Sequence, residues 1–192
     1  MFLQASDTEE AAAYLENERA STGYVMNLER VWAWRPEVAE SFVALRKQLM
    51  ESSSLTAREF AVLVCATAHT LSDSYCALAW GPRLAAQSDA ATAAAVLSGT
   101  DANTMSARER ALRRWAEQIV RAPSSTRAEQ VEALRAAGLT DREIFDASAF
   151  VAFRLAFATV NDALGARPDA ALVAAAPAEV RAAVTYGRPP MA

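Results

Sequence analysis

The chain has 192 residues, a formal net charge of −4 and an apolar fraction of 53%, and much of that fraction is alanine, the best helix former. This length fits one domain with a substantial core. The acidic balance shows no basic face, so nucleic acid is not an expected partner. No apolar run reaches the roughly 18 residues that a membrane span requires. The first residues do not resemble a signal peptide and two cysteines do not make a disulfide framework, so a cytoplasmic protein is expected.

Helix starts are marked by a repeated pattern in which Ser or Thr is followed three residues later by Glu. In this capping box each side chain accepts a hydrogen bond from the backbone N–H of the other residue. The pattern occurs at Ser6/Glu9, Thr56/Glu59, Ser106/Glu109, Thr126/Glu129 and Thr140/Glu143. Each match opens a segment of helical period, and no alternating strand pattern competes with it. The sequence therefore predicts an all-α fold.

The predicted helices can be taken in chain order. They cover residues 7–20, a short segment at 28–32, a helix from Pro36, then 57–70, 75–86, 90–97, a helix from the Ser106 capping box to before Pro123, 127–137 and 141–164. The helix from Pro36 carries Val38, Phe42, Leu45 and Leu49 on one stripe. Residues 60–66 are apolar all round, which is typical of a central buried helix.

The chain divides into a predicted helical domain, residues 1–166, and a C-terminal arm, residues 167–192. The arm alternates alanine with proline, and we interpret it as carrying one weak helix that packs on a neighbouring subunit. Two segments of the chain have similar sequences, Leu55-Thr56-Ala57-Arg58-Glu59 and Met105-Ser106-Ala107-Arg108-Glu109. We interpret this similarity as two good helix caps.

Several short phrases, in this order and spacing, resemble the carboxymuconolactone decarboxylase and alkylhydroperoxidase D (AhpD)-like family, especially its uncharacterised peroxidase-related branch. They are Gly23 to Leu28, Arg35-Pro36-Glu37, Leu55 to Glu59, Met105 to Leu112 and Leu134 to Ile144. The resemblance spans roughly residues 5 to 166. It implies an all-α, AhpD-like helical domain that forms a homo-oligomer (dimer, trimer or hexamer) and requires no cofactor.

The redox motif of that family is mostly missing here. Active members carry Cys-x-x-Cys at a helix start, a histidine four residues after the second cysteine and a glutamate on the preceding helix. By this resemblance the second cysteine corresponds to Cys76, whereas the other three positions hold Asp73, Trp80 and Ala61. A thiol peroxidase needs a second thiol to resolve the sulfenic acid. The ordinary two-cysteine peroxidase relay is therefore not expected.

Cys76 is the first candidate catalytic residue and Asp73 is the second. Asp73 is expected to cap the helix that carries Cys76. Free N–H groups and the helix dipole would favour a thiolate near the third helical position, while the Asp73 carboxylate would oppose it. The alternative is an inert, semi-buried cysteine. Cys65 could pair with Cys76, but its apolar surroundings favour a place in the core.

His69 is the only histidine and the third candidate catalytic residue, because its ordinary pKa lies near neutrality. A capping or solvated histidine at a helix end is the alternative. One histidine without an acidic cluster of ligand spacing predicts no metal site.

Trp80, Tyr75 and Arg154 are the candidate substrate-binding residues. Trp80 lies one helical turn after Cys76, so it either lines a pocket for an apolar ligand or plugs that pocket. Arg154 interrupts an apolar helix and would need an anionic partner if buried; Asp73, Asp146 or a substrate carboxylate could serve, with an exposed or interfacial position as the alternative.

Three functions remain open. The first is a cofactor-free enzyme with a divergent active site that acts on a small organic molecule. The second is a weakened thiol oxidoreductase that uses a single cysteine and an external resolving thiol. The third is a non-catalytic helical oligomer that binds a ligand or a partner.

Overall fold

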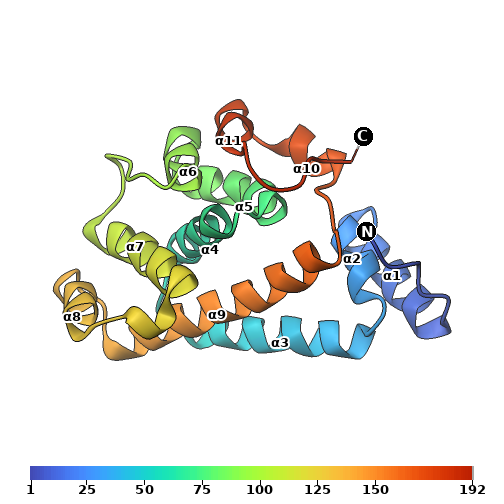
Figure 1. The fold of residues 1–192 in the computed structure, drawn as a ribbon, viewed down its shortest axis with the longest axis horizontal. Coiled ribbons are helices and arrows are strands. Elements are labelled where there is room, and N and C mark those ends of the chain that lie inside the picture. The colour runs from blue at the N-terminus through green and yellow to red at the C-terminus, as the bar shows by residue number, and fades with distance from the viewer. Residues whose placement is uncertain (192) are drawn as a thin grey trace.

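The computed structural model describes residues 1–191, and all regular elements in that range are helical (Figure 1). They are α1 (Glu9–Thr22), α2 (Asn27–Trp32), α3 (Pro36–Ser52), α4 (Ala57–Leu71), α5 (Ser74–Gln87), α6 (Ala90–Leu97), α7 (Ala107–Arg121), the 3₁₀ turn η1 (Pro123–Ser125), α8 (Ala128–Ala136), α9 (Asp141–Ala163), α10 (Ala170–Ala175) and α11 (Ala178–Ala183). The predicted all-α fold class is confirmed. Within the described range, none of these helices is long and apolar enough to cross a bilayer.

Helix α4 forms the centre of the fold and packs against α5, α6, α7 and α9. Its residues from Phe60 to Ala68 are all buried, as the apolar run predicted. Long helices α3 and α9 lie side by side along one edge of the molecule, and α1 and α2 pack at one end of α3 (Figure 1). The candidate site lies beside this core, in a cavity lined by residues of α1, α2, α3, α5 and α9.

Three of the five predicted capping boxes are present, at the N-termini of α4, α7 and α9. The other two predictions are wrong. Thr8, and not Ser6, caps α1 by accepting from the N–H of Ala11. Helix α8 begins after Arg127, whose N–H donates to the side chain of Gln130.

The three capping glutamates also bind arginines of other helices. Arg58 on α4 lies 2.5 Å from Glu109 on α7, and Arg108 on α7 lies 2.8 Å from Glu59 on α4. Arg108 additionally binds Glu143 on α9 at 2.9 Å. The similarity between the two segments therefore reflects more than two good caps. The arginine of each segment forms an ion pair with the capping glutamate of the other.

The C-terminal segment packs on its own chain, and its contact with a neighbouring subunit stays a prediction. It forms two short helices, and both pack against α5. Val180 of α11 is fully buried and lies over Gly81, where an added Cβ would come within 2.6 Å of its side chain. The Tyr186 hydroxyl donates to the carbonyl of Leu97. The segment therefore completes the core around α5 and α6.

The apolar stripe of α3 is only partly covered. Phe42 and Leu49 are half-buried, whereas Val38 and Leu45 are 41% and 47% exposed. The homo-oligomer stays a prediction.

We predict that Arg108→Gln lowers the free energy of unfolding by about 2 kcal/mol, because it leaves the buried carboxylates of Glu59 and Glu143 without their cation. The matched control is Arg114→Gln, since Arg114 is 58% exposed where it pairs with Asp101, and it should change stability by less than about 0.5 kcal/mol. Urea denaturation measures both variants. Equal effects of the two substitutions would contradict the role given to the ion pairs.

Candidate functional site

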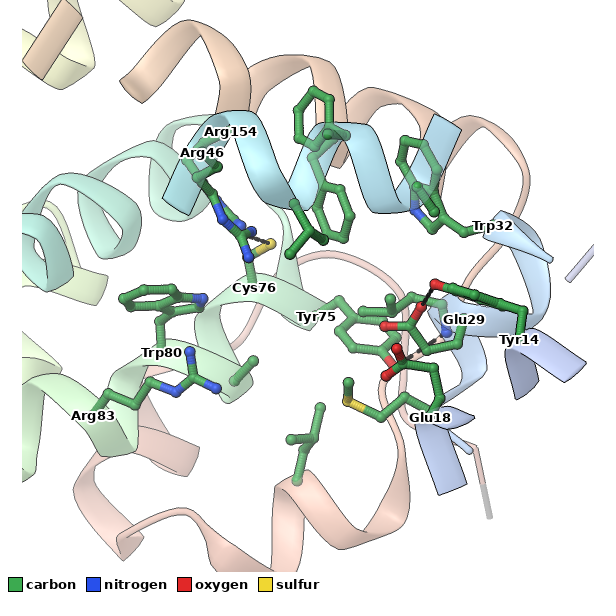
Figure 2. A pocket seen from close by; sticks show the side chains of 18 residues that line it. Tyr14, Glu18, Glu29, Trp32, Arg46, Tyr75, Cys76, Trp80, Arg83 and Arg154 are labelled. Atoms are coloured by element: carbon green, nitrogen blue, oxygen red, sulfur yellow. Dashed lines mark hydrogen bonds between the residues drawn. The ribbon is translucent and has the colours of Figure 1, made fainter. Parts of the chain in front are cut away.

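A cavity of about 300 Å³ opens among α1, α2, α3, α5 and α9 (Figure 2). Its walls are mostly apolar and aromatic, with contributions from Leu28, Trp32, Phe42, Trp80, Phe157 and Leu172. The Trp32 ring stacks on Phe157 with centroids 5.2 Å apart and on Phe42 at 5.9 Å. This size and lining suit a small organic molecule.

Cys76 lies at the wall of this cavity, in the first turn of α5. Asp73 caps the helix as predicted, and its carboxylate accepts from the Cys76 N–H at 2.9 Å. A guanidinium N–H of Arg154 on α9 donates to the Cys76 sulfur at 2.7 Å. Burial raises the pKa of the thiol, the Arg154 charge opposes this, and the Asp73 charge adds to it. The cysteine therefore rests as a neutral thiol beside a cation that would stabilise its thiolate.

Arg154 is buried, with 3% of its surface exposed, so the exposed alternative is wrong. Within residues 1–191 it forms no salt bridge, and neither Asp73 nor Asp146 pairs with it. Its Nε has no hydrogen-bond partner in the described chain. Its Cζ lies 5.1 Å from the Phe157 ring centroid and 5.7 Å from that of Trp80. Aromatic faces and a thiol thus surround this cation in place of a carboxylate.

Trp80 lines the cavity and leaves it open. The Cζ of Arg83, one helical turn further along α5, lies 4.6 Å from the centroid of the Trp80 ring. Figure 2 shows the Trp80 indole on the same side of the cavity as Cys76, Arg83 and Arg154. Of the two interpretations of Trp80, the structure favours a pocket wall over a plug.

Tyr75 also borders the cavity, but its hydroxyl is already engaged. It donates to Asp169, which precedes α10, and accepts from the N–H of Leu28 at 3.3 Å. Asp169 in turn accepts from the N–H of Asn27 at 3.0 Å. The Tyr75 side chain therefore ties α5 to the start of α2 and presents its ring to the cavity.

Glu29 and Tyr14 form a second polar pair at the opposite side of the cavity (Figure 2). The Tyr14 hydroxyl donates to the Glu29 carboxylate. Burial raises the pKa of Glu29 to about 7, while the Tyr14 hydrogen bond lowers it and the nearby Glu18 raises it. A carboxyl group that titrates near neutral pH in a cavity can both accept and donate a proton.

Sequence reasoning missed Glu29, Tyr14, Arg46 and Arg83, all of which line the cavity. Charged residues on amphipathic helices are ordinarily solvent-exposed. One signal was available for Arg46, because it follows Phe42 by four residues and so lies on the same stripe of α3. Glu29 gave no comparable signal.

His69 and Cys65 lie outside this cavity. The His69 Nδ1 hydrogen-bonds with the carbonyl of Leu97 at 2.9 Å, and its ring meets Tyr186 edge-on at 5.7 Å. Cys65 is fully buried, and both cysteines are free thiols. The structure thus brings Cys76, Asp73, Trp80, Tyr75 and Arg154 together and leaves His69 apart from the cavity.

No protein-family model matches the chain, and no curated protein matches it significantly. Solved structures do. An uncharacterised peroxidase-related protein with an AhpD core from Ralstonia eutropha JMP134 superposes with a TM-score of 0.76 at 24% identity, covering 89% of this chain and 93% of that one. A peroxidase-related protein from Silicibacter sp. TM1040 gives the same TM-score and identity, covering 89% and 91%.

A third similar structure is that of a cysteine-to-alanine variant of the debrominase Bmp8 in complex with 2,3,4-tribromopyrrole. It superposes with a TM-score of 0.70 at 16% identity, covering 90% of this chain and 92% of that one. These likenesses confirm the resemblance drawn from the sequence at the level of the fold. The chain has the AhpD-like helical fold.

We predict that the stability difference between wild type and Glu29→Gln depends on pH. The folded-state pKa of about 7 lies above the ordinary value of 4.5, so the stabilisation linked to protonated Glu29 is fully present below about pH 4.5 and is lost as the pH rises through about 7. Wild type should therefore lose up to about 3 kcal/mol relative to Glu29→Gln over this range.

Urea denaturation at several pH values between about 4 and 8 measures this difference. The charged and titratable groups that act on Glu29 are Tyr14, Glu18, Arg46 and Asp169, and all of them are present in both proteins, so the subtraction isolates Glu29. A difference that does not change with pH would contradict the prediction.

Proposed function

We propose that the chain is a cofactor-free enzyme that performs acid–base chemistry on a small organic molecule bound in the cavity among α2, α3, α5 and α9. The observation that carries this proposal is the Cys76 thiol, held at the cavity wall by buried Arg154. The debrominase of the same fold binds 2,3,4-tribromopyrrole as a cysteine-to-alanine variant. A protein of this fold that holds a small organic ring supports the proposal.

Glu29 and Cys76 face the ligand space from different sides (Figure 2). As a carboxylate, Glu29 accepts a proton from an acidic C–H of the substrate, which leaves the electron pair on the substrate as an enolate. The guanidinium of Arg154 stabilises that negative charge. Cys76, which rests as a neutral thiol because burial raises its pKa, then donates its proton to another carbon, and solvent exchange resets both groups. The net reaction is an isomerisation without a change of oxidation state.

Two other candidate residues act on this site as positioning residues in the proposal. Asp73 holds the N–H of Cys76 and thereby the start of α5. Tyr75 anchors the same helix to Asp169 and the start of α2. His69 has no part in it, because its ring contacts Leu97 and Tyr186.

The second candidate is the single-cysteine thiol oxidoreductase, and one contact favours it. The Arg154 guanidinium at 2.7 Å from the Cys76 sulfur would stabilise an attacking thiolate. An external thiol would have to reduce the oxidised sulfur, since Cys65 is fully buried and does not line the cavity. Burial of Cys76, which raises its pKa, weighs against this candidate.

The test uses protein dialysed against a chelator and a panel of small cyclic and aromatic ketones, lactones and organic acids in D₂O. Nuclear magnetic resonance follows deuterium uptake and double-bond migration. With a substrate found, Cys76→Ala and Glu29→Gln should each lower kcat by about 100-fold or more. Cys65→Ala is the matched control, because it removes the thiol that lies outside the cavity, and it should retain the wild-type rate.

Each alternative gives a distinct result in the same samples. Wild-type rates in both Cys76→Ala and Glu29→Gln would sink the acid–base proposal. Hydroperoxide consumption with dithiothreitol that disappears in Cys76→Ala would favour the single-cysteine oxidoreductase. Binding of panel compounds without any turnover would favour the non-catalytic ligand-binding protein.

A further inference from the structure

Three arginines from three helices meet at one end of the cavity. They are Arg46 on α3, Arg83 on α5 and Arg154 on α9, and Figure 2 shows them around Cys76 and Trp80. Arg154 is buried, Arg46 is half-buried and Arg83 is exposed. Burial, together with the positive charges of Arg154 and Arg83, lowers the pKa of Arg46 to about 10. The three positive charges therefore act on one another, and Arg154 is the one that lies out of water.

No carboxylate of residues 1–191 forms a salt bridge with any of the three. The other buried arginine of the described chain, Arg113, does bind carboxylates, those of Asp101 and Glu117. Removing a cation from water without a counterion is costly. The absence of a counterion thus distinguishes buried Arg154 from buried Arg113, and the Nε of Arg154 has no hydrogen-bond partner in the described chain.

The other side of the cavity has the opposite character. Glu18 and Glu29 lie there, away from the arginines (Figure 2). These carboxyl groups would repel a second negative charge on a ligand. The rings of Trp32, Phe42 and Phe157 pack on one another and form an aromatic wall of the cavity. The cavity is therefore suited to a molecule with one anionic end, an apolar ring and an uncharged far end.

We propose that the cavity binds an organic anion whose carboxylate or phosphate head lies among Arg46, Arg83 and Arg154 and whose ring lies against the aromatic wall. Guanidinium groups match both head groups through paired N–H donors. The inference rests on the proposed function, because it assigns a substrate class to the same cavity. It also places the anionic head beside the Cys76 sulfur, which receives a hydrogen bond from Arg154.

The first experiment compares alkylation of Cys76 by anionic iodoacetate and by neutral iodoacetamide in a Cys65→Ala background, followed by mass spectrometry. The reference is the ratio of the two rates for the same thiol in urea-unfolded protein. In the folded protein we expect the ratio of iodoacetate to iodoacetamide to rise by about tenfold, since a cationic cavity concentrates anions. Arg46→Gln combined with Arg83→Gln should return the ratio to the unfolded value. Arg30→Gln, at an exposed position on α2, should not.

The second experiment measures protection of Cys76 from iodoacetamide by benzoate, phenyl phosphate, inorganic phosphate and neutral benzamide. Benzoate or phenyl phosphate should slow the reaction, and benzamide should not. Comparison of benzoate with phenyl phosphate identifies the preferred head group. If inorganic phosphate protects as well as phenyl phosphate does, the ring contributes nothing to binding, which contradicts the proposal.

The outcomes separate this inference from the proposed function. If iodoacetamide modifies Cys76 but iodoacetate shows no preference and no anion protects, the anion subsite is wrong while the open cavity remains. If neither reagent modifies folded Cys76, and benzoate and phenyl phosphate also leave the nuclear magnetic resonance spectrum of the protein unchanged, the cavity does not admit small molecules, and both the subsite and the proposed enzyme are wrong.

Discussion

The buried guanidinium of Arg154 determines the character of the cavity. A cation out of water ordinarily has a carboxylate beside it, yet this one has the Cys76 sulfur at 2.7 Å and the faces of Phe157 and Trp80. These contacts are weaker than an ion pair, so the charge remains available to a ligand. The same charge partly offsets the burial that raises the pKa of Cys76. Reactivity of the thiol and affinity for an anion therefore depend on one side chain.

The frame around this charge is built from helices and not from loops. Cys76 belongs to α5, whose start is held by Asp73 and by the bond from Tyr75 to Asp169. Arg154 belongs to α9, whose start is tied to α7 through Glu143 and Arg108. Because both helices pack against central α4, the sulfur and the guanidinium are held in fixed geometry before any ligand binds, which favours a preorganised site.

Sequence patterns were informative where one local interaction decides the structure. The capping boxes of α4, α7 and α9 are such cases, since the Ser or Thr and the Glu satisfy each other's backbone. At the other two matches a different side chain caps the helix. Thr8 accepts a backbone hydrogen bond at the start of α1, and Gln130 does so at the start of α8. Tertiary packing was less visible. The alanine-rich C-terminus was expected to carry one weak helix, whereas it forms two, and the fully buried Val180 of the second packs against Gly81.

Only part of the candidate site could be predicted from the sequence, again because local spacing is easier to read than tertiary packing. Cys76, Trp80 and the Asp73 cap share one helix start, so local spacing relates them. Arg46, Arg83 and Glu29 join them only through the packing of separate helices. Relative to the family motif that this sequence resembles, the first cysteine and the histidine are replaced by Asp73 and Trp80, whereas α9 supplies a cation to the remaining sulfur. The cavity lining holds no second thiol, and buried Arg154 in that lining forms no salt bridge within the described residues. Such a cavity is better equipped to bind and protonate an anionic organic molecule than to pass electrons between sulfur atoms.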